Sequence, residues 1–214
     1  MVLFERPKLS QVLTNGLNEL KLALSETQHE QLLDYLALLN KWNKVYNLTS
    51  VRDPMQMMTL HLLDSLAAVP AFAGAQNVLD VGAGGGLPGI VLAIARPDMK
   101  VSMIDTVHKK TAFLTQVKAE LGLGNATIYT KKVQELETAQ PFDVITSRAF
   151  ADLSDFVNWS GHLLADGGRF IALKGTAPAD ERERLPEPWK VSGLQALQVP
   201  GLDAERHLVF IQKA

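Results

Sequence analysis

The stretch that most constrains the fold is residues 80–90, which read Asp-Val-Gly-Ala-Gly-Gly-Gly-Leu-Pro-Gly-Ile. A short apolar run precedes it at 77–79, and a longer one follows at 90–95. This pattern predicts a strand, a glycine turn and a helix, with Pro88 in the first turn of that helix. Glycine lets the chain reverse tightly and lets a ligand approach bare backbone. The start of the helix presents free N–H groups above the turn, so we expect a ligand site there.

Two carboxylates indicate what such a turn would bind. Residues 84–89 match the Gly-x-Gly-x-x-Gly pattern of dinucleotide-binding proteins, but that pattern alone is weakly specific. Asp80 ends the strand, where a carboxylate would repel a pyrophosphate and suit the cationic amino acid portion of S-adenosylmethionine. Asp105 ends the next apolar run, 101–104, where a carboxylate can accept hydrogen bonds from both ribose hydroxyls. The pair favours S-adenosylmethionine; a turn that only packs a helix on a sheet is the alternative.

The composition is that of an ordinary globular protein. The chain has 214 residues, 47% of them hydrophobic and 21% charged, with a formal net charge of −2 that argues against unspecific coating of nucleic acid. It has no cysteine, which excludes disulfides, thiolate metal ligands and a thiol nucleophile. No apolar run approaches the roughly 20 residues of a membrane span, and residues 1–7 lack a signal-peptide core. We therefore expect a cytoplasmic location.

The first 72 residues have helical periodicity and no strand pattern. Apolar residues recur at helical spacing from 9 to 24, and Gly16 among them is unfavourable for a continuous helix. Ser25, with Gln28 three residues on, predicts the start of a second helix, whose apolar stripe runs to Trp42. A polar, broken segment follows at 43–54, and a third helix at 55–69. We expect residues 1–72 to form a helical cap packed on the core.

From residue 77 strands and helices alternate, which predicts an α/β fold with a mostly parallel sheet in a domain spanning 73–214. Strands are expected near 77–81, 100–104, 126–130, 142–146 and 168–173, and helices near 88–95, 109–121 and 151–164. Residues 175–188 are charged and contain prolines, which predicts an exposed loop. Strands at 190–199 and 207–212 around the turn at 200–203 predict an antiparallel hairpin at the sheet edge.

In an open α/β sheet the ligand lies beyond the carboxyl ends of the strands. The segments at those ends should therefore converge, although they span nearly a hundred positions. They are Asp80 to Gly86, Asp105, Lys131 to Gln134, Ser147 to Phe150, and Lys174 with Gly175.

Five motifs in this order resemble one family, the small-subunit ribosomal RNA guanine-N7 methyltransferases, also called glucose-inhibited division protein B. The motifs are Trp42-Asn-x-x-Tyr-Asn-Leu-Thr49, His61-Leu-Leu-Asp-Ser-Leu66, Leu79-Asp-Val-Gly-x-Gly-x-Gly-Leu-Pro-Gly-Ile90, Ser147-Arg-Ala-Phe150 and Leu173-Lys-Gly175. The resemblance covers essentially the whole chain. It implies a Class I S-adenosylmethionine-dependent methyltransferase fold, Rossmann-like with a C-terminal antiparallel hairpin, and methylation of guanine N7 in 16S ribosomal RNA.

The resemblance also implies cofactor contacts. Carried over by position, they fall on Gly82, Leu87, Val133, Gln134 and Arg148. The family often has Arg-x-Glu after the third strand where this chain has Lys132-Val-Gln134, so the contact at Gln134 is the least secure. With the carboxylates and glycines of the turn, the predicted cofactor-binding set is Asp80, Gly82, Gly84, Gly86, Leu87, Asp105, Val133, Gln134 and Arg148.

The chemistry of the implied reaction restricts the catalytic residues. Guanine N7 carries an in-plane lone pair and no proton, so attack on a sulfonium methyl needs no general base, and positioning dominates. Arg148 and Lys174 are the candidate catalytic donors, toward guanine O6 and its Watson–Crick edge. The alternative for Arg148 is a structural ion pair with a neighbour such as Asp152, and for Lys174 a solvated lysine.

Lysines around the predicted site are candidates for RNA contact. They are Lys109, Lys110, Lys131, Lys132 and Lys174, although lysines on helices commonly form only a solvated face. The partner is expected to be small-subunit ribosomal RNA, and because the net charge is slightly negative we expect it as a partly folded ribonucleoprotein rather than as free RNA. We also expect a monomeric enzyme. We expect His61 to be a packing residue. For Asn43, Tyr46 and Asn47 we expect capping of the helix junction, with contact to the cofactor as the alternative. No cluster has metal-ligand spacing, so we expect no metal.

Three other functions fit part of the sequence. A small-molecule methyltransferase would close the helical cap over a metabolite and would show a sealed apolar pocket instead of a basic rim. A nicotinamide-dependent oxidoreductase would use residues 84–89 as its fingerprint and bind NAD. A third possibility is a protein that senses S-adenosylmethionine without turnover.

Overall fold

The computed structural model describes residues 3–148, 150, 152–177 and 179–214. Ala149 of the Ser147–Phe150 motif, the first two residues and the predicted helix start at 151 lie outside this set. Before the first strand the elements are α1 (Arg6–Glu19), α2 (Glu26–Tyr46), α3 (Pro54–Met57), the π-helical η1 (Met58–Leu63), α4 (Asp64–Ala68) and the 3-10 turn η2 (Val69–Phe72). None of the helices in the described part of the chain is long and apolar enough to cross a membrane.

From residue 77 strands and helices alternate, as predicted. The strands are β1 (Asn77–Val81), β2 (Lys100–Asp105), β3 (Ala126–Thr130), β4 (Phe142–Ser147), β5 (Leu164–Lys174), β6 (Trp189–Ala196) and β7 (His207–Lys213). The helical elements between them are α5 (Gly89–Ala95), α6 (His108–Leu121), η3 (Val133–Glu135), α7 (Leu153–Ser160), η4 (Gly161–Leu163) and α8 (Ala179–Glu183). The short helix α8 lies in the segment predicted as a loop.

The strands form one seven-stranded sheet in the order β3-β2-β1-β4-β5-β7-β6. The first five are parallel, and β7 pairs antiparallel with both β5 and β6. The predicted C-terminal hairpin and mostly parallel sheet are therefore confirmed. Because β1 and β4 are central neighbours although distant in sequence, the order of strands reverses direction at β1, which is where open α/β sheets bind ligands.

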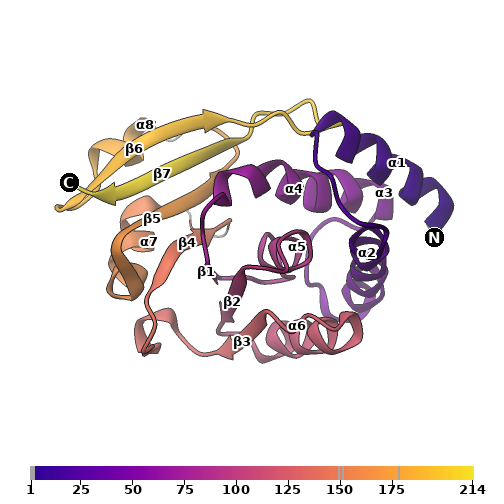
Figure 1. Ribbon diagram of the computed structural model, residues 1–214, viewed down its shortest axis with the longest axis horizontal. Coiled ribbons are helices and arrows are strands. Elements are labelled where there is room, and N and C mark those ends of the chain that lie inside the picture. Colours follow the sequence, from indigo (N-terminus) through magenta and orange to yellow (C-terminus); the bar gives the residue numbers. More distant parts are fainter. Residues whose placement is uncertain (1–2, 149, 151, 178) are drawn as a thin grey trace.

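Alternation along the strands divides the apolar side chains between two cores, one on each face of the sheet. In β1, Val78 packs with the larger core, which includes α5, α6 and the N-terminal helices. Leu79 packs with the smaller core around α7. Figure 1 shows this arrangement, with α2, α4, α5 and α6 gathered on one side of the sheet and α7 on the other. The N-terminal helices share the larger core with the sheet.

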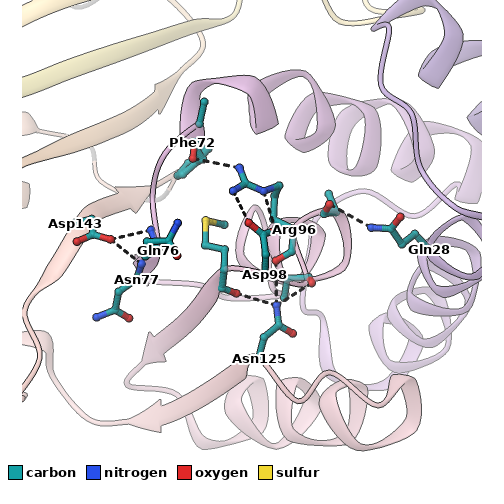
Figure 2. A network of polar contacts seen from close by, with 12 residues as sticks. Gln28, Phe72, Gln76, Asn77, Arg96, Asp98, Asn125 and Asp143 are labelled. Carbon is teal, nitrogen blue, oxygen red and sulfur yellow. Dashed lines mark hydrogen bonds and ion pairs between the residues drawn. The ribbon is translucent and has the colours of Figure 1, made fainter.

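A polar network fixes the amino ends of the strands, opposite the expected ligand side (Figure 2). Asp143 accepts hydrogen bonds from the backbone N–H groups of Gln76 and Asn77, both at 2.8 Å. The amide of Asn125 donates to three carbonyls after and within α5, and Gln28 donates to the carbonyls of Ile94 and Ala95. Since Gln28 also completes the predicted capping box with Ser25, the same side chain starts α2 and docks it on α5.

Candidate functional site

Three glycines of the loop after β1 have a backbone that other residues rarely adopt. Gly82, Gly84 and Gly86 have φ of 70°, 56° and 92°. At Gly86 a Cβ would lie 2.5 Å from Ile90 Cγ1, so this glycine is needed to pack the loop on α5. At Gly84 a Cβ would meet only the Gly82 carbonyl, at 3.8 Å. Open space above Gly84 leaves its backbone accessible to a ligand.

Helix α2 supports this loop from the side of the N-terminal helices. The hydroxyl of the fully buried Tyr35 donates to the Gly85 carbonyl at 2.6 Å. A Cβ on Gly85 would lie 3.3 Å from Leu39 Cδ1. The N-terminal helices therefore hold the loop in position.

Asp80 ends near this loop but points toward α5. Its side chain is fully buried, and Oδ2 accepts a hydrogen bond from Gly89 N at 2.8 Å. Among the described residues Oδ1 has no hydrogen-bond partner. Burial raises the pKa of Asp80 to about 7, against the hydrogen bond from Gly89 and the positive charge of Arg148. A direct contact between this carboxylate and a ligand remains a prediction.

Asp105, the second predicted carboxylate, lies at the carboxyl end of β2. Its Oδ2 accepts from Gly84 N at 3.0 Å, and its Oδ1 accepts from Val107 N at 2.9 Å. Lys110 Nζ is 3.5 Å away. These contacts fix the orientation of the carboxylate, and each oxygen keeps a lone pair for a further donor.

A cavity of about 730 Å³ opens beside Asp105, within the range of small-molecule sites. Its wall comes from the ends of β1 and β2, the start of α6, the segment after β3, and α7. The predicted residues that it brings together are Gly82, Asp105, Lys110, Lys131, Lys132, Val133 and Gln134. The predicted residues that do not line it are Asp80, Gly84, Gly86, Leu87, Lys109, Arg148 and Lys174.

Arg148 is held by the N-terminal helices. Its Nη1 donates to the Leu60 carbonyl in η1 at 3.1 Å and to Asp64 Oδ2 at 3.2 Å. Asp152, the partner suggested by the sequence, forms its ion pair with Arg184 at 3.2 Å. The ion pair considered as an alternative for Arg148 therefore exists, but its carboxylate is that of Asp64. Sequence reasoning missed Asp64, which lies far from Arg148 in the chain.

Lys174 lies at the end of β5 and contacts the segment after β4. Its Nζ donates to Glu181 Oε2 at 2.8 Å and to the Phe150 carbonyl at 3.2 Å. Glu181 in turn accepts from Leu153 N, at the start of α7. Through these hydrogen bonds Lys174 positions the loop that carries Phe150. A solvated lysine is excluded, because its side chain is only 13% exposed.

His61 is buried, as expected for a packing residue. Its Nε2 lies 2.8 Å from Thr49 Oγ1, and burial together with the positive charge of Arg148 lowers its pKa to about 4. Asn43 bonds Thr49 N and the Val51 carbonyl, while Asn47 caps α2 with φ of 52°. The predicted capping role is confirmed for Asn47, whereas Asn43 lies inside α2 and joins it to the segment that follows.

The cavity fits S-adenosylmethionine by its donors and acceptors. Asp105 offers a fixed carboxylate for a pair of hydroxyls, and Gly82 leaves bare backbone in the wall. Three lysines, Lys110, Lys131 and Lys132, stand in the cavity wall together with the carboxylates of Asp105 and Asp155. Within the described ranges, no group of three or more His, Cys, Asp or Glu is arranged to hold a metal ion.

Comparison with known proteins decides the family. The family model for rRNA small subunit methyltransferase G matches residues 28–209. A ribosomal RNA small subunit methyltransferase G from Janthinobacterium sp. (strain Marseille) is 67% identical over all of this chain and 99% of its own length. One from Ralstonia nicotianae is 57% identical over 92% of each chain. The chain belongs to the rRNA small subunit methyltransferase G family.

As a member of this family, the chain is an S-adenosylmethionine-dependent methyltransferase that acts on guanine N7 of 16S ribosomal RNA. The fold agrees with this assignment. The O-methyltransferase from Bacillus cereus, crystallised in complex with SAH, superposes with a TM-score of 0.57 at 18% identity over 85% of this chain and 91% of its own. At that identity the likeness concerns the Class I methyltransferase fold alone, and it confirms the predicted fold class.

Proposed function

We propose that the cavity beside Asp105 is the cofactor site of this methyltransferase. Asp105 would accept hydrogen bonds from the ribose hydroxyls, the loop with Gly82 and Gly84 would lie beside the amino acid portion, and Val133 and Gln134 would contact the adenine. The observation that carries this proposal is the orientation of Asp105, because hydrogen bonds from backbone N–H groups fix both of its oxygens. A preorganised acceptor loses little freedom on binding.

Asp80, Gly86 and Leu87 would act on the same site through the loop. Leu87 is 6% exposed, and Gly86 packs against α5, so both shape the loop from beneath. Asp80 fixes the start of α5 through Gly89. A cationic ligand nearby would favour ionisation of Asp80, whose pKa burial raises to about 7, since electrostatic interactions in a buried site extend beyond contact distance.

When bound, S-adenosylmethionine supplies an electrophilic methyl group on a sulfonium. Guanine N7 has a free lone pair, so the chain needs to orient the base and exclude water, and needs no side chain to remove a proton. Arg148, at the carboxyl end of β4, would donate to guanine O6. Lys174 would hold the neighbouring segment through its hydrogen bond to the Phe150 carbonyl.

We propose a ribonucleoprotein form of the small subunit as the substrate, bound in the cytoplasm by a monomeric enzyme. The basic charge is local: Lys110, Lys131 and Lys132 surround the cavity, whereas the whole chain carries a net charge of −2. Lys109, exposed on the same helix, would extend this surface. Such a small basic surface suits a substrate that proteins partly cover, and phosphate contacts would make binding sensitive to salt.

The test is transfer of a labelled methyl group to small subunits isolated at successive stages of assembly, followed by mapping of the methylated base. The proposal expects label on guanine N7 in one partly assembled form, and rates that fall steeply with salt. Replacing Lys131 and Lys132 together by alanine should flatten this salt dependence, while Lys8→Ala, an exposed lysine outside the cavity wall, should not. Equal labelling of naked RNA, or a salt dependence unchanged by the double replacement, would contradict it.

A further inference from the structure

Three residues of the cavity wall have no role in the contacts proposed above. They are Phe150, in the segment after β4, and Asp155 and Trp159 of α7. We propose that these residues, the aromatic corner, recognise a purine: its ring stacks on the aromatic side chains, and its amino group donates to Asp155. This inference rests on the proposed function, since it assigns a subsite of the same cavity.

The aromatic pair is arranged as a corner with one fixed wall. The rings of Phe150 and Trp159 lie with centroids 5.5 Å apart and planes at 71°. Phe150 also stacks on the fully buried Phe156, at 5.1 Å and 26°, so its ring is held in place from behind. A planar ligand can stack on one ring and meet the edge of the other, which are the favourable geometries for aromatic groups.

Trp159 is exposed where its helix neighbours are not. It is 41% exposed, whereas Leu153 and Phe156 of the same helix are fully buried. Packing of α7 on the sheet therefore does not require a large aromatic side chain at this position. A stacked base would cover it, and stacking of a base on an aromatic side chain contributes about 1–3 kcal/mol.

Asp155 adds a polar requirement to the corner. It lies four residues before Trp159, so the two side chains share one face of α7. No hydrogen bond or ion pair joins its carboxylate to another residue in the described part of the chain. An ionised carboxylate only accepts hydrogen bonds. It therefore suits the 6-amino group of adenine or the N1–H and 2-amino group of guanine, and it disfavours the O6 and N7 edge of guanine.

The purine has two possible sources, the adenine of the cofactor and the target guanine. If guanine is bound by its N1–H and 2-amino edge, its N7 lies on the opposite side of the ring, open to the methyl group. If adenine is bound, Asp155 would select the 6-amino group near Val133 and Gln134, which line the same cavity. Both sources present an amino group in the plane of a purine, which is the chemistry that the corner requires.

The experiment compares Asp155→Ala, Trp159→Leu and Trp159→Phe with Asp166→Ala, which removes an exposed carboxylate outside the cavity. For each variant, calorimetry gives the Kd of S-adenosylhomocysteine and of S-inosylhomocysteine, in which a carbonyl replaces the 6-amino group. Methyl transfer at saturating cofactor gives the KM for undermethylated small subunits. Thermal unfolding shows which variants keep the wild-type fold, and Asp155→Asn replaces Asp155→Ala if that variant does not fold.

If the purine is adenine, Asp155→Ala and Trp159→Leu should raise the Kd of S-adenosylhomocysteine about tenfold, and Asp155→Ala should abolish its preference over S-inosylhomocysteine. If it is the target guanine, these Kd values should stay constant and the KM for subunits should rise about tenfold. In both cases Trp159→Phe should retain most of the function and Asp166→Ala all of it.

The inference would be overturned if Asp155→Ala and Trp159→Leu changed both the Kd of S-adenosylhomocysteine and the KM for subunits by less than twofold. It would also be overturned if Trp159→Phe were as impaired as Trp159→Leu. Asp105→Ala separates this failure from that of the proposed function. Loss of S-adenosylhomocysteine binding in Asp105→Ala, with the corner variants unaffected, overturns the corner alone. Unchanged binding in Asp105→Ala overturns the proposed cofactor site, and the corner inference with it.

Discussion

Asp64 Oδ2 accepts a hydrogen bond from Arg148 Nη1 at 3.2 Å, although 84 positions separate the two residues in the chain. The other oxygen of Asp64 accepts from Arg206 Nε at 2.8 Å, and the carboxylate is only 4% exposed. One buried side chain thus connects α4, the carboxyl end of β4 and the start of β7. The N-terminal helices are therefore part of the framework that positions Arg148.

Replacing Asp64 by asparagine should affect both the stability of the fold and methyl transfer. Removing the charge should lower the free energy of unfolding by about 2 kcal/mol, because two charge-assisted hydrogen bonds weaken while the arginines stay partly hydrated. Methyl transfer should fall more than tenfold, since Arg148 loses its carboxylate partner. Arg206→Ala is the matched control, because it removes the other ion pair and leaves Arg148 with Asp64. Equal losses of transfer in the two variants would show that the network is only structural.

Tyr35→Phe tests how α2 supports the glycine loop. The change removes the hydrogen bond to the Gly85 carbonyl and leaves the buried ring in place. We expect a loss of about 1 kcal/mol in stability, or a fall of roughly 2–4 °C in Tm, together with weaker binding of S-adenosylhomocysteine. Tyr46→Phe, at a tyrosine that is 41% exposed, should change neither quantity. A wild-type Kd in Tyr35→Phe would mean that the loop keeps its shape without α2.

Alanine substitutions at two glycines with similar φ distinguish the cost of backbone strain from the cost of a side-chain clash. Gly86 and Gly74 have φ of 92° and 79°, but a Cβ at Gly86 would lie 2.5 Å from Ile90 Cγ1, and one at Gly74 meets nothing within 4 Å. Gly74→Ala should cost only the backbone strain, about 1 kcal/mol. Gly86→Ala should cost about 1–3 kcal/mol more, because side chains must also shift. Chemical denaturation measures both, and equal losses would contradict the packing role of Gly86.

The raised pKa of Asp80 predicts an unusual dependence of stability on pH. In the unfolded chain this carboxyl ionises near its ordinary pKa of 3.8, whereas the folded chain retains the proton until about pH 7. Between these values, raising the pH lowers the stability of the wild type, by up to ~1.4 kcal/mol per pH unit. Asparagine cannot ionise, so Asp80→Asn should gain stability relative to the wild type from pH 4 to pH 7 and level off above. A constant difference over that range would show that burial does not hold the proton on Asp80.

The alternation of apolar strand segments with helical segments after residue 77 predicted the sheet well. Apolar runs predicted the strands within a few residues, and the glycines predicted the turn between β1 and α5. Helix ends were harder to predict. Helix α1 ends at Glu19, not 24, because Leu22 N bonds Leu17 O and Lys21 takes φ of 55° without a glycine to signal the turn. Gly16, a residue unfavourable in helices, lies inside the continuous helix α1, and Leu63 packs where a Cβ would lie.

The candidate site was predictable where residues follow a strand end and not where distant segments meet. Asp105 ends β2, Val133 and Gln134 come shortly after β3, and all three line the cavity. Asp64 could not be connected with Arg148, because that contact depends on how η1 and α4 lie beside the carboxyl end of β4. Trp159 was unrecognised, since one aromatic residue on an amphipathic helix commonly belongs to the core. Its exposure is a property of the packed structure.

The central claim, that the cavity beside Asp105 holds the cofactor, is tested most directly by a crystal structure of the protein with S-adenosylhomocysteine. We predict both ribose hydroxyls within hydrogen-bonding distance of the Asp105 carboxylate, with the ligand beside the loop containing Gly82 and Gly84. A ligand bound elsewhere, or a ribose that makes no contact with Asp105, would contradict it.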